Sequence, residues 1–409
     1  MIRNLLIYIS AILLLTACHK HHEEEAWMPQ RTVLVYMAGE NNLSYNVLYD
    51  LREMMAASID PTNDCLLVYV DRAKKEELPY LARIKDGKLT DSVSVADMNI
   101  SQEDPYTSDP RVMEGVMRYA FNKYRSADSD YGLVLWGHAS GWLPGDSITT
   151  NAARETGRRK AFGGDTGNNT MVSAGKYWMN MYTLAQVLSR LPHLRFIFAD
   201  CCHFQCLESA YELRNVADYI IGSPAEIPDV GAPYTTVVPA LFEKTTFYTS
   251  VVNRYYEQVI DSVKYVPLSV IKTEGMDQLA AATRQVLLSM ADTLGATPYP
   301  NLKGLIHYYV NPRFPDANDF VRHYATAEAY STWKQALDQV VVYKKMAMRW
   351  ATNRMWSLYY KDFTMTEEGY GGVSMYVPQD PAKETDDNYN KAIRNTSWYE
   401  AVGLSDLGW

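Results

Sequence analysis

The sequence predicts an α/β fold in which helices cover a mostly parallel β-sheet. Short apolar runs rich in β-branched residues alternate with segments of helical periodicity over residues 30–240, a pattern typical of parallel strands joined by helices. The chain has 409 residues, 47% of them hydrophobic and 21% charged, so it can bury one large core or two smaller ones. No fixed-period repeat is visible, which argues against a solenoid.

Five apolar runs are predicted as buried strands, and the segments between them as helices. In "LSYNVLYDLREMMAA" the residues Leu43, Val47, Leu51 and Met54 share one helical face, as expected for a helix packed on a sheet. The strands are expected at residues 33–37, 65–72, 133–136, 194–202 and 218–226, and the helices at residues 43–57, 109–124, 181–191 and 208–217.

The sequence becomes helix-rich beyond about Pro239. Segments 251–263, 276–290 and 330–353 have helical patterns, and a late apolar run, "GGVSMYVP" at residues 371–378, is predicted as a strand. We therefore expect a signal peptide at 1–17, a tether at 18–29, a core at 30–240 and a helix-rich region at 241–409 that completes or flanks this core.

The N-terminus has the pattern of an export signal. Arg3 precedes an apolar stretch from Leu5 to Leu15, which is too short to span a membrane. The end of this stretch, "LTAC", resembles a bacterial lipobox, and this resemblance implies lipidation of Cys18 and a lipid-anchored protein of the cell envelope, outside the cytoplasm. A plain secretory signal with an incidental cysteine is the alternative. We interpret the following "HKHHEEE" as a solvated tether rather than a metal tract.

The composition gives little support for a nucleic-acid partner. The formal net charge is -9, and no stripe of Lys and Arg with interleaved aromatic residues occurs. A nucleic-acid-binding surface requires such a positive footprint. We expect contact with a lipid bilayer through the N-terminal anchor instead.

Two predicted strands end in residues with chemical potential. "LWGHASGW" places His138 after one strand, and "FADCCHFQCLE" places Asp200, Cys201 and Cys202 after another. Functional groups of parallel sheets gather at the carboxyl ends of strands. A cysteine and a histidine brought together there are the minimum for thiol-dependent acyl transfer.

Other interpretations of the cysteines remain open at this point. A disulfide between the neighbours Cys201 and Cys202 would be strained. A zinc site built on "CCHFQC" is an alternative, although its spacing is irregular. Cys206, one helical turn beyond Cys202, is expected to pack rather than react.

Several blocks of the chain resemble successive blocks of the clostripain family of cysteine peptidases. These are "TVLVYMAGENNLSYNVLYDL", "YGLVLWGHASGW", "FADCCHFQCLESAYEL", "YIIGSPAE" and, more weakly, "GGVSMYVP". The resemblance implies a caspase-like α/β/α sandwich. It places the nucleophile at Cys202, because Glu208 follows by the six residues of the family pattern, and the histidine at His138.

These assignments define an expected mechanism. A Cys202 thiolate at a helix N-terminus would attack a peptide carbonyl and form a thioacyl enzyme, and His138 would protonate the leaving amine. The backbone N–H groups of Ala139 and Cys202 are the expected oxyanion donors, at about 3 kcal/mol each. Ala139 and Cys201 depart from the family pattern, which has Gly and Ala at these positions.

The resemblance also implies a preference for Arg or Lys before the scissile bond. Asp200 matches the acidic residue of the family's specificity pocket, and helix capping is its alternative role. Glu226 or Asp229 is expected to be a second acid. Clostripain-like enzymes are commonly cut between the two catalytic strands, where the polar, Gly-rich segment 149–170 holds the candidate cleavage residues Arg154, Arg158, Arg159 and Lys160.

The sequence thus predicts a lipid-anchored cysteine endopeptidase, expected to be a monomer that acts on a peptide or protein substrate. A non-catalytic binding or scaffold lipoprotein is the main alternative, and a zinc or thiol-redox protein is a third. No metal or other cofactor is indicated by the residues, and only the family resemblance leaves room for calcium.

Overall fold

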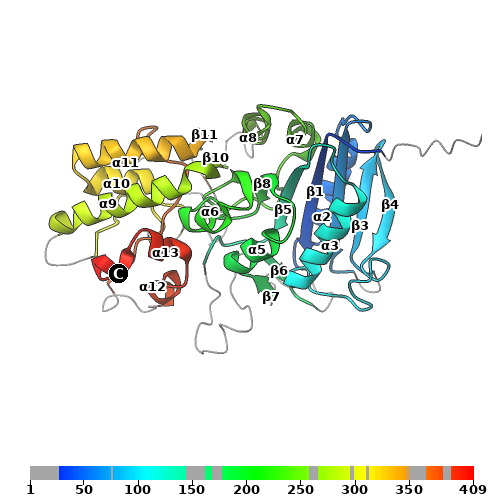
Figure 1. Ribbon diagram of the computed structural model, residues 1–409, viewed down its shortest axis with the longest axis horizontal. Helices are drawn as coiled ribbons and strands as arrows, with labels where there is room; N and C mark the ends of the chain where they lie inside the picture. Colours follow the sequence, from blue (N-terminus) through cyan, green and yellow to red (C-terminus); the bar gives the residue numbers. More distant parts are fainter. Residues whose placement is uncertain are drawn as a thin grey trace, which may run out of the picture.

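The computed structural model describes residues 27–74, 77–143, 162–167, 177–257, 266–294, 299–309, 313–347, 350, 365–380 and 388–409 (Figure 1). The predicted signal peptide, the lipidation residue Cys18 and most of the tether lie outside these ranges. The candidate cleavage residues Arg154, Arg158, Arg159 and Lys160 also lie outside them.

A nine-stranded sheet runs through the molecule in the order β11-β10-β9-β8-β5-β1-β2-β3-β4. The five central strands, from β9 to β2, are parallel, whereas two antiparallel strands extend each end. The strands are β1 (Arg31–Gly39), β2 (Asp64–Arg72), β3 (Tyr80–Lys85), β4 (Lys88–Ser94), β5 (Asp130–Gly137), β8 (Leu194–Asp200), β9 (Ala217–Gly222), β10 (Leu268–Lys272) and β11 (Val341–Lys345).

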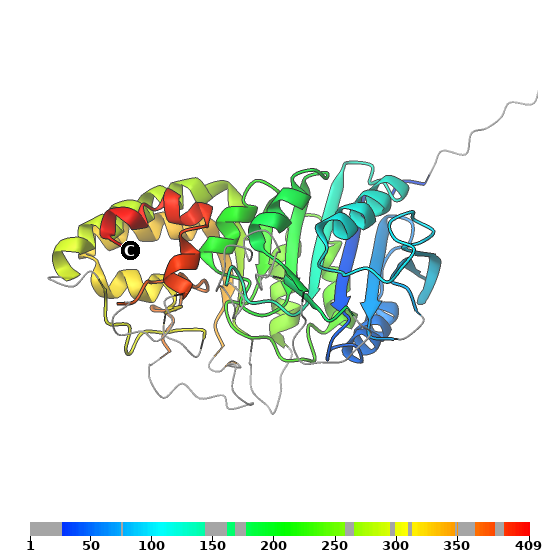
Figure 2. The ribbon, with the colours of Figure 1, turned by 90° about the horizontal axis from the view of Figure 1, so that it is seen from below.

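Helices cover both faces of this sheet, and each face has its own apolar core. Figure 2 shows α2 and α3 on opposite sides of the strands. One face is covered by α2 (Asn46–Ala56), α7 (Tyr234–Leu241) and α8 (Phe247–Glu257). The other is covered by α3 (Pro110–Lys123), α5 (Met181–Leu188), α6 (Leu207–Leu213) and α9 (Met276–Leu294). The predicted three-layer α/β/α sandwich is therefore confirmed.

The region beyond residue 240 contributes to the same sheet and core. Its strand β10 pairs with β9, and β11 pairs with β10. One apolar cluster extends from Leu34 to Trp409. The remaining elements of this region are α10 (Ala317–Tyr324), α11 (Ala327–Val340), α12 (Asn388–Ile393) and α13 (Ser397–Ala401). None of the described helices is both long and apolar enough to cross a membrane.

Two sequence expectations for this region are wrong. The helix predicted at 330–353 ends at Val340, and residues Val341–Lys345 form β11, because consecutive β-branched valines can pair with the sheet edge at β10. The late run 371–378 is buried throughout but forms only single bridges, from Ser374 to Cys206 and Asp316. It passes between the starts of α6 and α10, and the carbonyl oxygen of Gly372 accepts from the hydroxyl of Ser269 on β10 at 2.6 Å without forming a ladder.

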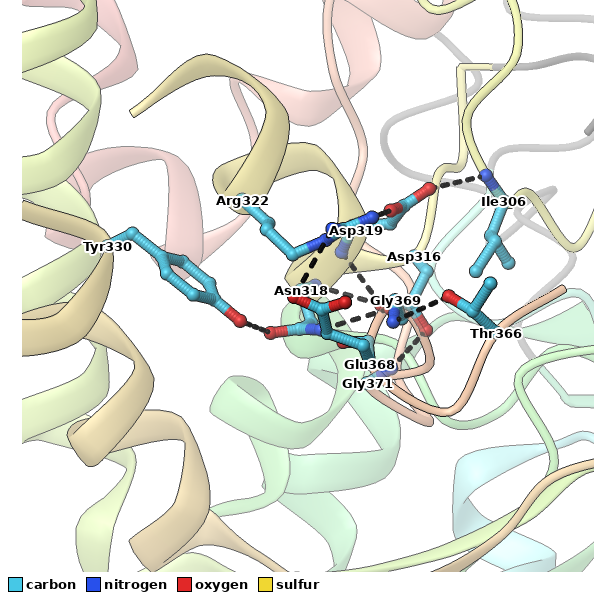
Figure 3. Close-up of polar contacts among 10 residues, drawn as sticks. All are labelled: Ile306, Asp316, Asn318, Asp319, Arg322, Tyr330, Thr366, Glu368, Gly369 and Gly371. Atoms are coloured by element: carbon cyan, nitrogen blue, oxygen red, sulfur yellow. Dashed lines mark hydrogen bonds and ion pairs between the residues drawn. The ribbon is translucent and has the colours of Figure 1, made fainter. Parts of the chain in front are cut away.

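Asp316 holds this late segment in place (Figure 3). Its buried carboxylate accepts hydrogen bonds from the backbone N–H groups of Gly371, at 2.8 Å, and Gly372, at 3.0 Å. It also caps α10 by accepting from the N–H of Asn318 at 2.8 Å. One carboxylate thus joins the start of a helix to a segment that follows it by more than 50 residues.

Candidate active site

The pairing of β5 with β8 brings the two predicted catalytic residues to one edge of the sheet. Trp136 on β5 lies opposite Asp200 on β8 in a parallel register. His138 and Cys202 each follow these paired residues by two positions. Because both strands end here and run in the same direction, the two side chains belong to neighbouring loops at the carboxyl edge.

Gly137 allows the chain to leave β5 and present His138. Its φ of +136° is rarely adopted by residues with a side chain, and an added Cβ would lie 2.8 Å from the carbonyl oxygen of Ala38 on β1. A glycine is therefore required between the buried strand and the histidine.

Neighbouring elements hold the imidazole of His138. Its Nε2 lies 2.7 Å from Oδ1 of Asn42 in the loop after β1. Its backbone carbonyl accepts from the N–H of Gly163 at 3.0 Å. The ring of Trp178 is 6.3 Å away, between centroids. Gly163 and Trp178 belong to the small hairpin of β6 (Phe162–Asp165) and β7 (Tyr177–Met179). Burial lowers the pKa of His138, which favours the neutral imidazole at pH 7.

The Cys202 thiol is partly buried against the segment after β9. Its Sγ lies 3.3 Å from the backbone nitrogen of Ile227 and 3.8 Å from the carbonyl oxygen of the same residue. Burial raises the pKa of the thiol to about 12, and the charge of Glu226 adds to this shift. The thiol is therefore protonated in this arrangement.

The expectation of a thiolate stabilised by a helix N-terminus is wrong. Helix α6 starts at Leu207 and is capped at Cys206, so Cys202 lies in the loop ahead of it. The dipole of a seven-residue helix acts mainly within its first turn. Burial and a nearby carboxylate dominate the electrostatics of Cys202 instead.

The other cysteines of the cluster are packed. Cys201 and Cys206 are 2% and 3% exposed, and all cysteines among the described residues are free thiols. Sγ of Cys206 donates to Oγ of Ser209 at 3.0 Å. Among the residues that the structure describes, one group of three side chains is close enough to share a metal ion, and it contains no cysteine or histidine. The zinc interpretation of "CCHFQC" therefore has no structural support.

Asp200 is buried beneath the carboxyl edge of the sheet. Its carboxylate accepts from the hydroxyls of Tyr234, at 2.8 Å, and Tyr255, at 3.0 Å, and from the N–H of Ala232, at 3.0 Å. These bonds lead to α7, α8 and the loop before α7, not to the start of α6, so its alternative role in capping that helix receives no support. Burial raises the pKa of this carboxyl.

The two candidates for a second acid differ in position. Glu226 is partly buried, acts electrostatically on Cys202 and lies 3.7 Å from Nε2 of His203. Asp229 is exposed, and its backbone carbonyl accepts from Asn46. Glu226 is thus the candidate that lies beside the predicted nucleophile.

Glu208 has a structural position. It is fully buried at the start of α6, and Oε1 accepts from the N–H of Tyr376 at 2.6 Å. The interval between Cys202 and Glu208 therefore connects the loop that carries Cys202 to the buried segment 371–378. The carboxylate is directed away from the reaction and into the core.

Sequence reasoning missed the residues of the loop after β1. In this loop Oδ1 of Asn42 lies 2.7 Å from Nε2 of His138. Glu40 lies with Asp71 and Asp165 in a buried group of carboxylates, with ligand atoms within 4.8 Å of one another. The one feature of the sequence that could have identified these residues is that they are polar and lie near the ends of apolar strands.

These three carboxylates are also the calcium candidates among the described residues, with ligand atoms within 4.8 Å of one another. Calcium takes about six to eight oxygen ligands, which carboxylates, carbonyls and water can supply. Protein hydrogen bonds already engage part of the group: Asp165 accepts from the N–H groups of Thr107 and Gly167, at 2.6 and 2.8 Å, and Asp71 accepts from the hydroxyl of Thr107.

The sequence matches the family model described as the clostripain family over residues 35–408. The chain belongs to the clostripain family. Members of this family are cysteine peptidases, so the chain is a hydrolase rather than a scaffold or redox protein. Comparison with curated proteins finds no match.

Solved structures of clostripain-family peptidases have the same fold. A secreted C11 cysteine protease from Bacteroides thetaiotaomicron, in complex with an irreversible peptide inhibitor, is 30% identical with a TM-score of 0.72, covering 92% of this chain and 99% of its own. An inactive zymogen C11 protease from Parabacteroides distasonis is 26% identical with a TM-score of 0.70, covering 92% and 98%. A second secreted protease from Bacteroides thetaiotaomicron, iotapain, is 17% identical with a TM-score of 0.67, covering 92% and 99%, and shares the fold.

We expect alkylation of Cys202 in the resting peptidase to depend steeply on pH. With a thiol pKa of about 12, the thiolate fraction grows about tenfold per pH unit, so labelling by iodoacetamide should rise about 100-fold from pH 7 to pH 9. Mass spectrometry of the labelled peptide measures the rate, with glutathione as the reference thiol. A rate that is already constant across this range would show a thiolate paired with an imidazolium instead.

Proposed function

We propose that this clostripain-family peptidase is an endopeptidase that cleaves after Arg or Lys, with Cys202 as nucleophile and His138 as general acid and base. The register of β5 against β8 carries the assignment of these two residues. Trp136 pairs with Asp200, and His138 and Cys202 each follow their strand residue by two positions. A resting dyad of neutral thiol and neutral imidazole fits the buried surroundings of both groups.

In the proposed reaction the thiol proton moves to His138 as Sγ of Cys202 attacks the peptide carbonyl. The developing oxyanion accepts hydrogen bonds from the backbone N–H groups of Ala139 and Cys202. The C–N bond then breaks, the imidazolium gives its proton to the leaving amine, and a thioester remains. Water, deprotonated by His138, attacks this thioester and regenerates the thiol.

The proposed preference for Arg or Lys rests on Asp200. Its carboxylate lies two residues before the nucleophile, and a second buried carboxylate, Asp50, is close to it. A Cβ on Gly231 would lie 3.0 Å from Oδ2 of Asp200 and 3.3 Å from Oδ2 of Asp50. Burial and the mutual repulsion of the two carboxyls raise the pKa of Asp50 to about 8, and burial raises that of Asp200. A cationic side chain in the adjacent subsite would stabilise the ionised form of Asp200, and the carboxylate of Glu226 would add to this attraction.

We also propose export and lipid anchoring through Cys18. The "LTAC" sequence supports this, and two structural relatives are described as secreted. Several acyl chains on one cysteine would make attachment to the membrane stable. The peptidase would then act on peptides or proteins outside the cytoplasm.

Maturation by cleavage between β5 and β8 is the last part of the proposal. The connection contains a cluster of basic residues of the type that the proposed specificity accepts, and one relative is described as an inactive zymogen. Cleavage at this point would leave both catalytic strands in the sheet, since β5 and β8 pair directly.

Fluorogenic peptides that differ only in the residue before the bond test the specificity and the dyad together. We expect cleavage after Arg and Lys, and a loss of at least about 10⁴-fold in Cys202→Ala and His138→Ala. Asp200→Asn should lower kcat/KM for these substrates about 100-fold, because it removes the charge and keeps the shape.

Cys201→Ala and Cys206→Ala are the matched controls and should keep most of the activity. Full activity in Cys202→Ala would refute the nucleophile assignment. Equal cleavage after neutral and basic residues would refute the specificity alone.

Maturation is tested by incubating the wild-type peptidase beside Cys202→Ala. We expect a new N-terminus within residues 150–161 in the wild type and an intact chain in the variant, with activity rising as the cut form accumulates. N-terminal sequencing identifies the cut. An uncut wild-type chain with full activity would contradict the maturation proposal while leaving the dyad intact.

Cys18→Ser tests the anchor in cells. The wild-type protein should be recovered with the membrane fraction, and the Cys18→Ser variant should be released as soluble protein. Immunoblots of the fractions measure the distribution. Membrane recovery of both proteins in equal amounts would contradict lipidation at Cys18.

A further inference from the structure

The loop after β1 presents an amide group to the predicted catalytic histidine. Oδ1 of Asn42 and Nε2 of His138 are 2.7 Å apart, the length of a well-formed hydrogen bond between residues 96 positions apart in the sequence. Asn42 is exposed and contributes no apolar packing, so its position is not explained by the core.

The neighbouring Asn41 fixes the loop that carries this amide. Asn41 is fully buried, and its Nδ2 donates to the carbonyl oxygens of Ala38, at 3.0 Å, and Gly164, at 2.6 Å. Its Oδ1 accepts from the N–H of Leu43 at 2.8 Å. The loop is thereby attached to the end of β1 and to the β6 hairpin, which also contacts the backbone of His138. The backbone on both sides of Asn42 is thus fixed, through the side-chain hydrogen bonds of Asn41 to Ala38 and Gly164 and to the N–H of Leu43.

The contact has a chemical consequence for the imidazole. An amide oxygen can only accept a hydrogen bond, so Nε2 of His138 carries a proton. In a neutral imidazole the other nitrogen, Nδ1, then has the lone pair. That nitrogen is the one that can take the proton of a thiol. When it does, the positive charge is shared with Nε2–H, and its hydrogen bond to Asn42 becomes stronger.

We propose that Asn42 is a positioning residue that fixes the tautomer and the ring orientation of His138, so that Nδ1 is the proton acceptor for Cys202. The inference rests on the proposed catalytic role of His138 and adds a third residue to that pair. Asn42 does not touch the reacting atoms and acts only through the histidine. Its contribution should be largest once the imidazolium has formed.

Three variants test this role, each assayed on the peptide that the wild type cleaves best. Asn42→Ala should lower kcat about 10- to 100-fold with little change in KM, the effect of losing one hydrogen bond to a charged group. Asn42→Asp should restore much of the loss, and the pKa that the pH profile assigns to the histidine should rise, because a carboxylate favours the imidazolium. Asn63→Ala is the matched control. Asn63 directly precedes the amino end of β2, at the edge of the sheet opposite the site, and its amide donates a hydrogen bond to Asp60.

The tautomer can be measured without turnover. In the Cys202→Ala protein labelled with ¹⁵N-histidine, the nitrogen shifts of His138 should report a proton on Nε2 at neutral pH, and Asn42→Ala should produce a mixture of both tautomers. Thermal unfolding should be nearly equal for Asn42→Ala and Asn63→Ala. A proton on Nδ1 in the parent protein would overturn the proposal, since the amide would then be donating to a bare Nε2.

The kinetic outcomes separate this inference from the proposed function. If His138→Ala is inactive while Asn42→Ala has wild-type kcat and an unchanged pH profile, the positioning role is wrong and the dyad stands. If His138→Ala is fully active, the dyad itself is wrong and the role of Asn42 falls with it. A loss in Asn42→Ala that Asn42→Asp does not restore, with lowered thermal stability, would show a merely structural contact.

Discussion

The parallel pairing of β5 with β8 is the constraint on which the site depends. The pairing places Trp136 beside Asp200. If the register of β8 shifted by one residue, the side chains of β8 and of the residues that follow it would face the opposite side of the sheet. The register is secured by burial on both faces, since these strands have apolar contacts with two separate helical layers. Packing in the core thus determines which loops lie side by side at the carboxyl edge, those that carry His138 and Cys202.

Burial also sets the electrostatic state of the site. The same enclosure that fixes the strands raises the pKa of Cys202 and lowers that of His138. Both shifts disfavour the charged forms, so they oppose a standing ion pair of thiolate and imidazolium, in line with the proton transfer during attack that we propose. Neutral hydrogen-bonding partners such as Asn42 suit this state better than additional charges would.

The sequence predicts the central part of the fold better than its edges. Strands buried on both faces are continuous apolar runs, so β1, β2, β5, β8 and β9 are visible without a structure. The β3–β4 hairpin is absent from the predicted strands because its second strand, Lys88–Ser94, is polar and has no buried residue. The Asp86-Gly87 pair, both with positive φ, is its only strong sequence signal. Val341 follows a helix directly, so periodicity alone extends that helix too far.

For the site, the strand-end residues His138 and Cys202 could be proposed from sequence because they follow recognisable strands. The Asn42 contact could not, because it joins segments 96 residues apart. The sequence also could not show which of Glu226 and Asp229 lies nearer to the thiol of Cys202, since this depends on the path of the loop after β9.

The attachment of Glu208 to Tyr376 bears on how the molecule comes into being during synthesis. These partners are 168 residues apart, so the loop before α6 gains its last support only when nearly the whole polypeptide has emerged. Closing such a long loop is slow compared with forming a local helix or hairpin. The loop that carries Cys202 is therefore expected among the last parts to become rigid, and the proposed reactive centre would not be fully ordered until synthesis is almost complete.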